Sequence, residues 1–152
     1  MDNLFAWMEG TALAAWTRES PSLWAYPTII TLHSVGLAIV VGGSLAIDFR
    51  LLGWARAIPV AALTPLFRII AWAFALNAAS GFLLFMADAT TKATQPVFLV
   101  KLTLILVALL VTVAVARRVR QAPDRLDAPL MPIASVLLWL GAIAAGRLMA
   151  YL

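Results

Sequence analysis

The sequence predicts an all-α fold, an integral membrane four-helix bundle with a short N-terminal interfacial helix. The amino-acid composition indicates a membrane protein, because 64% of the 152 residues are hydrophobic and only 12% are charged. Soluble proteins average about 45 to 50% apolar and about 25% charged residues. The chain also contains four apolar runs, each close to the roughly 20 residues that a helix needs to cross a bilayer. The length fits a single transmembrane domain, residues 1–152.

The first predicted element is a helix over about residues 4–18, which is too short to span a membrane. Its apolar positions recur at helical spacing: Phe5, Met8, Ala12 and Trp16. Trp7 and Trp16 would lie at headgroup level, where tryptophan is enriched. We therefore expect this helix to lie in the plane of the interface.

The four predicted spans cover about residues 23–47, 66–87, 97–116 and 130–152. Prolines lie at or near the ends of these runs, where a missing backbone donor is tolerated. Small residues at i, i+4 spacing predict close helix contacts, since lipid provides no hydrophobic drive for association. These stripes are Ser34, Ala38, Gly42 and Ala46 on the first span, Ala71, Ala75 and Ala79 on the second, and Gly141 with Ala145 on the fourth.

Basic residues are concentrated in the two connections on one side of the predicted bundle. Seven of the eleven lie there: Arg50, Arg56, Arg68, Arg117, Arg118, Arg120 and Arg125. Cytoplasmic loops carry such an excess, so both termini are expected on the periplasmic or outer side. The same placement explains the pI of 10.4 without nucleic-acid binding. The absence of cysteine excludes disulfides, Fe–S clusters and thiolate metal sites.

Polar side chains inside the spans are candidates for function, because an ionisable residue at membrane depth costs about 2.5 to 3.5 kcal/mol on insertion scales. They are His33, Asn77, Asp88, Lys101 and Arg147. The sequence shows no carboxylate pair, no nucleophile with a base at useful spacing and no phosphate loop, so nothing indicates hydrolysis. Any chemistry would have to come from a cofactor.

His33 is the only histidine in the chain, and apolar residues surround it. Gly36, Gly43 and Arg50 fall on an adjoining stripe of the same helix, so the glycines would leave a shallow trough for a flat ligand or another helix. Three interpretations of His33 stay open, namely an interhelical hydrogen bond to Asn77 or Ser80, ligation of a heme, and proton handling.

Lys101 and Arg147 have two interpretations each. Either side chain alone would snorkel to the outer surface. Together with Asp88 they would equally well bind a carboxylate or a lipid headgroup.

Three stretches carry a resemblance to known proteins: LWAYPTIITLHSVGLAIVVGG, GFLLFMADA and LLWLGAIAAGRLMAYL. Through them the whole chain resembles an uncharacterised family of small four-helix bacterial inner-membrane proteins. It is more distantly similar to HemJ-type protoporphyrinogen oxidases and to CopD-type membrane proteins. In HemJ-type proteins a first-helix histidine is followed by a glycine-rich half-turn and a cytoplasmic arginine, and a lysine begins the third helix. The corresponding positions here are His33, Gly42 with Gly43, Arg50 and Lys101.

The resemblance implies a b-type heme in which His33 is an axial metal ligand and Lys101 is a second ligand or a propionate anchor. With a single histidine, the heme would be five-coordinate, ligated by a His/Lys pair or shared between protomers. The predicted heme site consists of His33, Gly36, Gly43, Arg50, Asn77, Lys101 and Arg147. The leading hypothesis is a redox protein of the bacterial inner membrane, either an electron carrier or a HemJ-like oxidase, and whether it is an enzyme stays open.

Two alternatives come from other classes of protein. One is a non-catalytic subunit of a larger membrane complex, or a homo-oligomeric scaffold, for which the small-residue stripes and the tryptophans suffice. The other is a small transporter or channel in which His33, Asn77, Asp88 and Lys101 line a path. The sequence lacks the broken helices and inverted repeats that transporters show. Membrane lipids are expected partners of the protein.

Overall fold

The computed structural model describes residues 2–121, 129–149 and 151, and all regular structure in these ranges is helical. The predicted all-α fold is therefore confirmed. The elements are α1 (Asp2–Glu9), α2 (Ala12–Glu19), α3 (Tyr26–Leu51), the 3-10 turn η1 (Val60–Leu63), α4 (Thr64–Met86), α5 (Ala89–Thr94), α6 (Pro96–Gln121) and α7 (Leu130–Leu148). The helices α3, α4 with η1, α6 and α7 are long and apolar enough to cross a membrane, as expected of a multi-pass membrane protein.

The observed spans begin and end at slightly different residues from those predicted. Helix α3 starts at Tyr26, after the predicted residue 23, because Pro27 is favoured in a first helical turn. It ends at Leu51, and α6 continues to Gln121, so both helices extend beyond the predicted ends at 47 and 116. Arginines in their last turns favour these extensions, since positive charge stabilises a helix C-terminus. Part of the predicted fourth span, at 150 and 152, lies outside the described residues.

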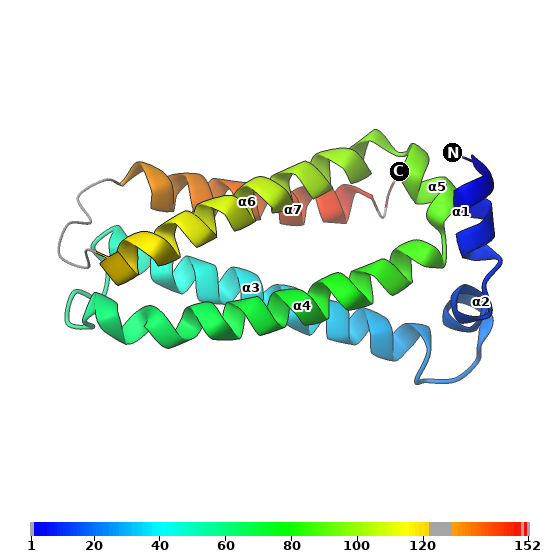
Figure 1. Ribbon diagram of the computed structural model, residues 1–152, viewed down its shortest axis with the longest axis horizontal. Helices are drawn as coiled ribbons and strands as arrows, with labels where there is room; N and C mark the ends of the chain where they lie inside the picture. Colours follow the sequence, from blue (N-terminus) through cyan, green and yellow to red (C-terminus); the bar gives the residue numbers. More distant parts are fainter. Residues whose placement is uncertain (1, 122–128, 150, 152) are drawn as a thin grey trace.

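The segment predicted as one interfacial helix over 4–18 forms two short helices, α1 and α2, which lie across one end of the bundle (Figure 1). The break falls at Gly10 and Thr11, and the Thr11 hydroxyl accepts a hydrogen bond from the backbone N–H of Ala14, which caps α2. We call this end, which carries α1, α2 and α5, the cap end. The opposite end, which carries residues 52–63 between α3 and α4, is the loop end.

Two polar contacts fasten α1 and α2 to the rest of the molecule, beside the edge-to-face packing of the Phe5 and Phe85 rings. The Glu9 carboxylate accepts hydrogen bonds from the backbone N–H and the hydroxyl of Thr90, at 2.7 and 2.8 Å. The Arg18 guanidinium donates to the carbonyl oxygen of Ala87 at 3.0 Å. A hydrogen bond from the exposed Arg18 to the Glu19 carboxylate raises the pKa of Arg18. The cap is thus held to the end of α4 and to α5 by polar contacts.

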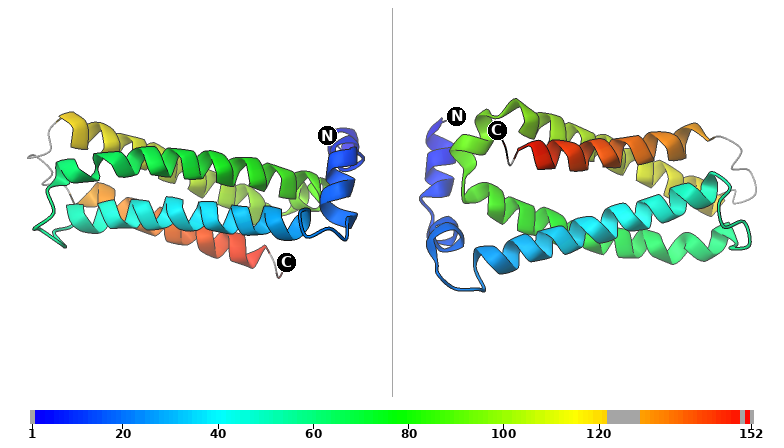
Figure 2. Two further views of the ribbon diagram at one scale, coloured as in Figure 1. Left: turned by 90° about the horizontal axis from the view of Figure 1, so that it is seen from below. Right: turned by 180° about the vertical axis from the view of Figure 1, so that it is seen from behind.

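The four long helices form two antiparallel hairpins, one of α3 with α4 and one of α6 with α7 (Figures 1 and 2). The closest packing lies within each hairpin, and the main contact between them is α3 against α7. The hairpins approach each other toward the loop end and diverge toward the cap end, as both the front and the back view show.

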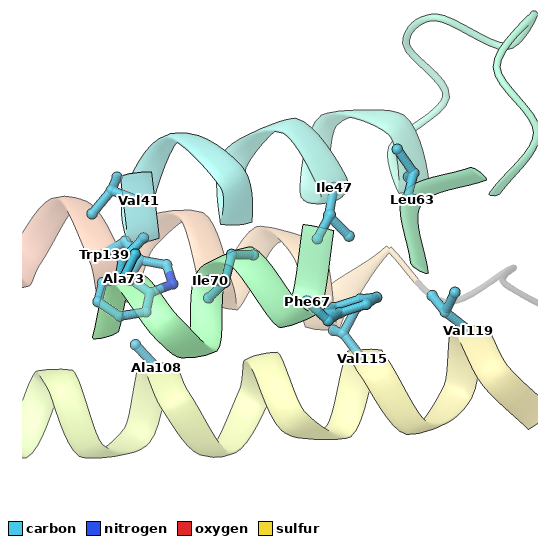
Figure 3. Packing of buried hydrophobic residues seen from close by; sticks show 11 residues of the cluster. Val41, Ile47, Leu63, Phe67, Ile70, Ala73, Ala108, Val115, Val119 and Trp139 are labelled. Atoms are coloured by element: carbon cyan, nitrogen blue, oxygen red, sulfur yellow. The ribbon is translucent and has the colours of Figure 1, made fainter. Parts of the chain in front are cut away.

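The buried hydrophobic cluster lies between the middle of the helices and the loop end (Figure 3). Its members are Val40, Val41, Ile47, Leu63, Phe67, Ile70, Ala73, Ala108, Val115, Val119 and Trp139. Trp139 is only 1% exposed and is the largest fully buried side chain of the described residues. The loop end is therefore the part of the molecule where the two hairpins share a packed core.

Small residues mark the helix contacts only in part. The predicted stripes on the first two spans are wrong as contacts within this chain, because their residues are exposed: Ser34, Ala38, Gly42, Ala46, Ala71, Ala75 and Ala79. Gly36 and Gly43 on the neighbouring face of α3 make the close contact with α4 instead. The contact predicted for the last span is present, since Ala145 is buried and Gly141 packs against Leu104 of α6.

Candidate functional site

His33 lies on α3 at the contact with α4 and is joined to that helix by hydrogen bonds. Its Nδ1 atom is 3.0 Å from the backbone oxygen of Asn77 and 3.3 Å from the hydroxyl of Ser80. The Asn77 amide in turn donates to the backbone oxygen of His33 at 2.7 Å. These are the two partners expected for a structural His33, so the imidazole contributes to the packing of α3 on α4.

The network also determines which ring nitrogen of His33 carries the proton. The Asn77 side-chain nitrogen lies 3.2 Å from Nδ1, but its shorter contact is to the His33 backbone oxygen at 2.7 Å. The Asn77 carbonyl oxygen, 3.0 Å from Nδ1, can only accept, so we assign the hydrogen to Nδ1. The Ser80 hydroxyl donates to the backbone oxygen of Leu76 and is left to accept. In the neutral ring Nε2 then carries a free lone pair, and it makes no hydrogen bond within the described residues.

Glycine on α4 makes room for the imidazole. A Cβ atom at Gly81 would lie 2.9 Å from Cε1 and 3.2 Å from Nδ1 of His33, which is closer than side chains approach. The ring therefore lies directly against the α4 backbone. Any larger residue at Gly81 would displace His33 from its hydrogen bonds.

The stripe of Gly36 and Gly43 faces α4. A Cβ at Gly36 would lie 3.1 Å from the backbone oxygen of Ala73 and 3.1 Å from Cβ of Asn77, and one at Gly43 would lie 2.9 Å from Ile70. The sequence left open whether a flat ligand or another helix occupies this trough. In the structure a helix does.

Lys101 comes from the other hairpin and lies on α6 against α7. Its Cε atom would be 3.4 Å from a Cβ at Gly146, so this glycine gives the long side chain its place. Lys101 and His33 belong to different hairpins, and no hydrogen bond joins them in the part of the chain that the structure describes. In the described ranges the Lys101 ammonium makes no hydrogen bond or ion pair. His33 and Lys101 are thus polar residues of two different hairpins, each in the half of its helix nearer the cap end.

The structure does not bring the other predicted site residues to His33. Arg50 follows it by 17 positions, about 25 Å along a helix, and donates to the backbone oxygens of Ile58 and Arg56 in the α3–α4 connection. Arg147 is exposed and lies over the ring of Tyr151, 5.6 Å from its centroid. These two arginines stabilise local structure at opposite ends of the molecule.

Asp88 closes α4 at the cap end and pairs with Lys92 at 3.6 Å. The pair is partly solvent-exposed, so it contributes little to stability. Asp88 therefore has a charged partner of its own.

Sequence reasoning missed a second polar cluster, at the loop end. Asp48 is 2% exposed, and its neighbours Ser44 on α3 and Ser135 on α7 are 2% and 1% exposed. The Ser135 hydroxyl lies beside the Asp48 carboxyl. Together with Phe67 and Thr112 these residues line one buried site between α3, α4, α6 and α7.

A signal for this cluster was present in the sequence. Ser44 and Asp48 are four residues apart, so on a helix they share a face. The first span was predicted to end at residue 47, which placed Asp48 in a polar connection. Because α3 continues to Leu51, the carboxyl is carried into the core.

The described residues hold no group of three or more histidine, cysteine, aspartate or glutamate side chains that would bind a metal ion. A heme needs fewer protein ligands, and His33 fits one because Nδ1 is held by a carbonyl while Nε2 is unpaired. Gly36, Gly43 and Arg50 are engaged elsewhere, so of the residues predicted for a heme site His33 and Lys101 are the two that keep an unpaired metal-ligating nitrogen in the described ranges. No protein-family model matches the chain, and no curated protein or solved structure matches it. The similarity to HemJ-type and CopD-type proteins stays a prediction.

Proposed function

We propose that the protein is a small heme-b-binding redox protein of the bacterial inner membrane, either an electron carrier or a HemJ-like oxidase. The observation that supports this best is the hydrogen bond between Nδ1 of His33 and the Asn77 carbonyl. Metal-bound histidines commonly donate their second ring N–H to such an oxygen, which fixes the tautomer and makes the ligating nitrogen more basic. When bound, heme b supplies one-electron redox chemistry.

The protein residues have distinct parts in this proposal. Asn77 and Ser80 orient the imidazole, and Gly81 lets the ring lie against α4. Lys101 supplies an amine or an ammonium from the opposite hairpin. As a neutral amine it would be a second iron ligand, and as an ammonium it would bind a heme propionate.

An absorption spectrum of purified protein, expressed with heme supplied, tests the proposal. Wild type is expected to show a Soret band and His33→Ala to lose it. Ser34→Ala is the matched control, because Ser34 is the next residue, is exposed and bonds only within its own helix. A wild-type protein without a Soret band under these conditions contradicts heme binding.

The role of Lys101 can be separated with the same spectra. If the amine ligates iron, Lys101→Met converts a low-spin six-coordinate spectrum into a high-spin five-coordinate one. If the ammonium binds a propionate, the variant retains less heme with an unchanged Soret position. An unchanged spectrum and heme content would remove Lys101 from the site.

The exposed stripe on α3 favours a second candidate, a homo-oligomer or an accessory subunit of a larger membrane complex. Ser34, Ala38, Gly42 and Ala46 are exposed along one face, and nothing lies within 4 Å of a Cβ at Gly42. Small residues at this spacing allow two membrane helices to approach closely. Gly42→Leu should then dissociate an oligomer extracted in native lipid without changing the unfolding temperature of the protomer, while Leu at the exposed position Ala75 serves as the control on α4.

We also propose that the loop end faces the cytoplasm and that both termini face the periplasm. Exposed arginines at the loop end support this orientation: Arg68, Arg117, Arg118 and Arg120. Because the chain has no cysteine, a single one introduced at Trp54 or at Tyr151 is a unique label. An impermeant thiol reagent should label intact spheroplasts at Tyr151→Cys only, and labelling at Trp54→Cys only would reverse the orientation.

A further inference from the structure

The cluster around Asp48 contains buried polar atoms that have no hydrogen-bond partner. Within the described residues, they are Oδ2 of Asp48 and Oγ of Ser44. Nε1 of Trp139, one helical turn from Ser135, also lacks a hydrogen-bond partner there. Asp48, Ser44 and Trp139 are each at least 98% buried. Buried polar atoms are nearly always paired, so this cluster requires a physical explanation.

No positive charge faces the Asp48 carboxyl in the described part of the chain. The side chains that meet it are Phe67 from α4, Thr112 and Val115 from α6, and Ser135 from α7, none of which is charged or titratable. The charged side chains on the loop-end parts of these helices point elsewhere. Arg68, Arg117, Arg118 and Arg120 are exposed, and Arg50 donates to loop carbonyls.

An ionised carboxylate in this place would be very unfavourable. A buried charge without a partner costs several kcal/mol even after the protein relaxes, and such groups are neutralised instead. The described side chains around Asp48 leave no room for a water molecule, so a metal ion with its shell of oxygen ligands does not fit without repacking. A proton needs no such room.

We propose that Asp48 is a proton-binding site, closed by the hydroxyls of Ser44 and Ser135, where α3 packs against α7. A protonated carboxyl has one O–H to donate and still accepts, and each serine hydroxyl does both. Ser135 already lies beside the carboxyl, whereas Oδ2 of Asp48 and the Ser44 hydroxyl, as placed, have no partner in the described part of the chain. The added proton gives Oδ2 a hydrogen to donate once the Ser44 side chain turns toward it. This site is separate from His33, 15 residues earlier on the same helix and about 22 Å away, and it does not rest on heme binding.

The proton has a structural consequence, because α3 against α7 is the main contact between the two hairpins. Loss of the proton leaves an unpaired charge inside that contact. The hairpins are then less firmly held at the loop end, and the free energy of unfolding falls as the pH rises through the titration of Asp48. The folding of the bundle is thereby linked to proton binding at one carboxyl.

Infrared difference spectroscopy of the full chain in lipid nanodiscs tests this inference. In the difference between acid and alkaline pH, the carbonyl stretching band of a protonated, non-aqueous carboxylic acid is expected in wild type, lost in Asp48→Asn and retained in Asp88→Asn. Asp88 is the matched control because its carboxylate is partly exposed and paired with Lys92. Ser135→Ala keeps the carboxyl but removes a hydrogen-bond partner, so it should shift the band. This variant tests the proposal even if Asp48→Asn does not fold.

Two results would overturn the proposal. One is a spectrum in which no carboxylic-acid band depends on Asp48 or Ser135. The other is an unfolding temperature that rises with Na⁺ or K⁺ concentration, at constant pH and ionic strength, in wild type but not in Asp48→Asn. This result would mean that Asp48 binds a metal ion instead of a proton. The unfolding temperature of wild type is expected to fall as the pH rises, whereas that of Asp48→Asn is expected not to change with pH.

Discussion

The two polar clusters of this membrane bundle differ in how completely they are paired. Around His33 the imidazole Nδ1, the Asn77 amide nitrogen and the Ser80 hydroxyl all have partners, and Nε2 of His33 has none among the described residues. Around Asp48 several buried atoms are unpaired. Hydrogen bonding between helices accounts for most of the first cluster, whereas in the second a proton on Asp48 would supply the donor that the carboxyl lacks.

The same division holds for apolar packing. The hydrophobic cluster occupies the loop end, where the hairpins meet, and the cap end has the diverging hairpins with His33 and Lys101 (Figures 2 and 3). Substitutions at the loop end should therefore affect global stability, and those at the cap end should affect ligand binding or local structure. The following predictions test this difference.

The largest effect is expected at Trp139, which is 1% exposed in the loop-end core. Trp139→Ala should reduce the free energy of unfolding by about 3 to 5 kcal/mol, because it leaves a large cavity. Trp72→Ala is the matched control, since Trp72 is 76% exposed on α4. Reversible unfolding in mixed micelles measures both, and equal losses would show that the loop end holds no special core.

The next effect concerns two glycines of α3 that lie on different faces. Gly36→Ala should cost about 1 to 3 kcal/mol, because its Cβ would press on the Ala73 backbone, which cannot move cheaply. Gly42→Ala should be neutral or stabilising by up to about 1 kcal/mol, since the position is open and alanine favours helix. The two unfolding curves should separate in opposite directions from wild type, and a loss at Gly42 as large as that at Gly36 would contradict the assigned faces.

A smaller effect is expected for the polar contact at the cap end. Asn77→Ala removes the donor to the His33 backbone oxygen, and interhelical hydrogen bonds in membranes contribute about 0.6 kcal/mol on average. The loss should be well below that of Trp139→Ala. Thr103→Ala, which removes a bond within one helix at an exposed position, is the control in the same unfolding assay.

The smallest global effect is expected at Glu9, whose carboxylate binds Thr90. Glu9→Ala should leave the unfolding temperature nearly unchanged, because the contact is exposed and involves only the cap. Amide hydrogen exchange should nevertheless become faster in α1, while Glu19→Ala, whose carboxylate pairs only with its neighbour Arg18, leaves α1 protected. Unchanged exchange in α1 would mean that apolar contacts hold the cap.

The sequence was sufficient for the helical class and for the four long apolar helices, because composition and run length depend on the bilayer rather than on tertiary detail. The sequence was insufficient to predict which face of each helix contacts its neighbour. Gly42 and Gly43 are adjacent, and only the direction from which α4 approaches decides that Gly43 is the contact. His33 was found because a lone histidine is conspicuous in an apolar run, and its pairing with Asn77 was among the expected interpretations. Asp48 was missed because a shift of four residues in a predicted helix end decides whether a carboxylate is in a loop or in the core.

The length of α6 has a consequence for the position of the protein in the bilayer. Its apolar part, residues 97–116, spans about 30 Å and matches the thickness of the hydrocarbon layer. The helix continues to Gln121, so its last turn projects into the headgroup region and carries Arg117, Arg118 and Arg120 among the lipid phosphates. Polar anchors of this kind fix the depth and limit the tilt of a membrane helix. We therefore expect the loop end, with its packed core, to keep a constant depth in bilayers of different thickness.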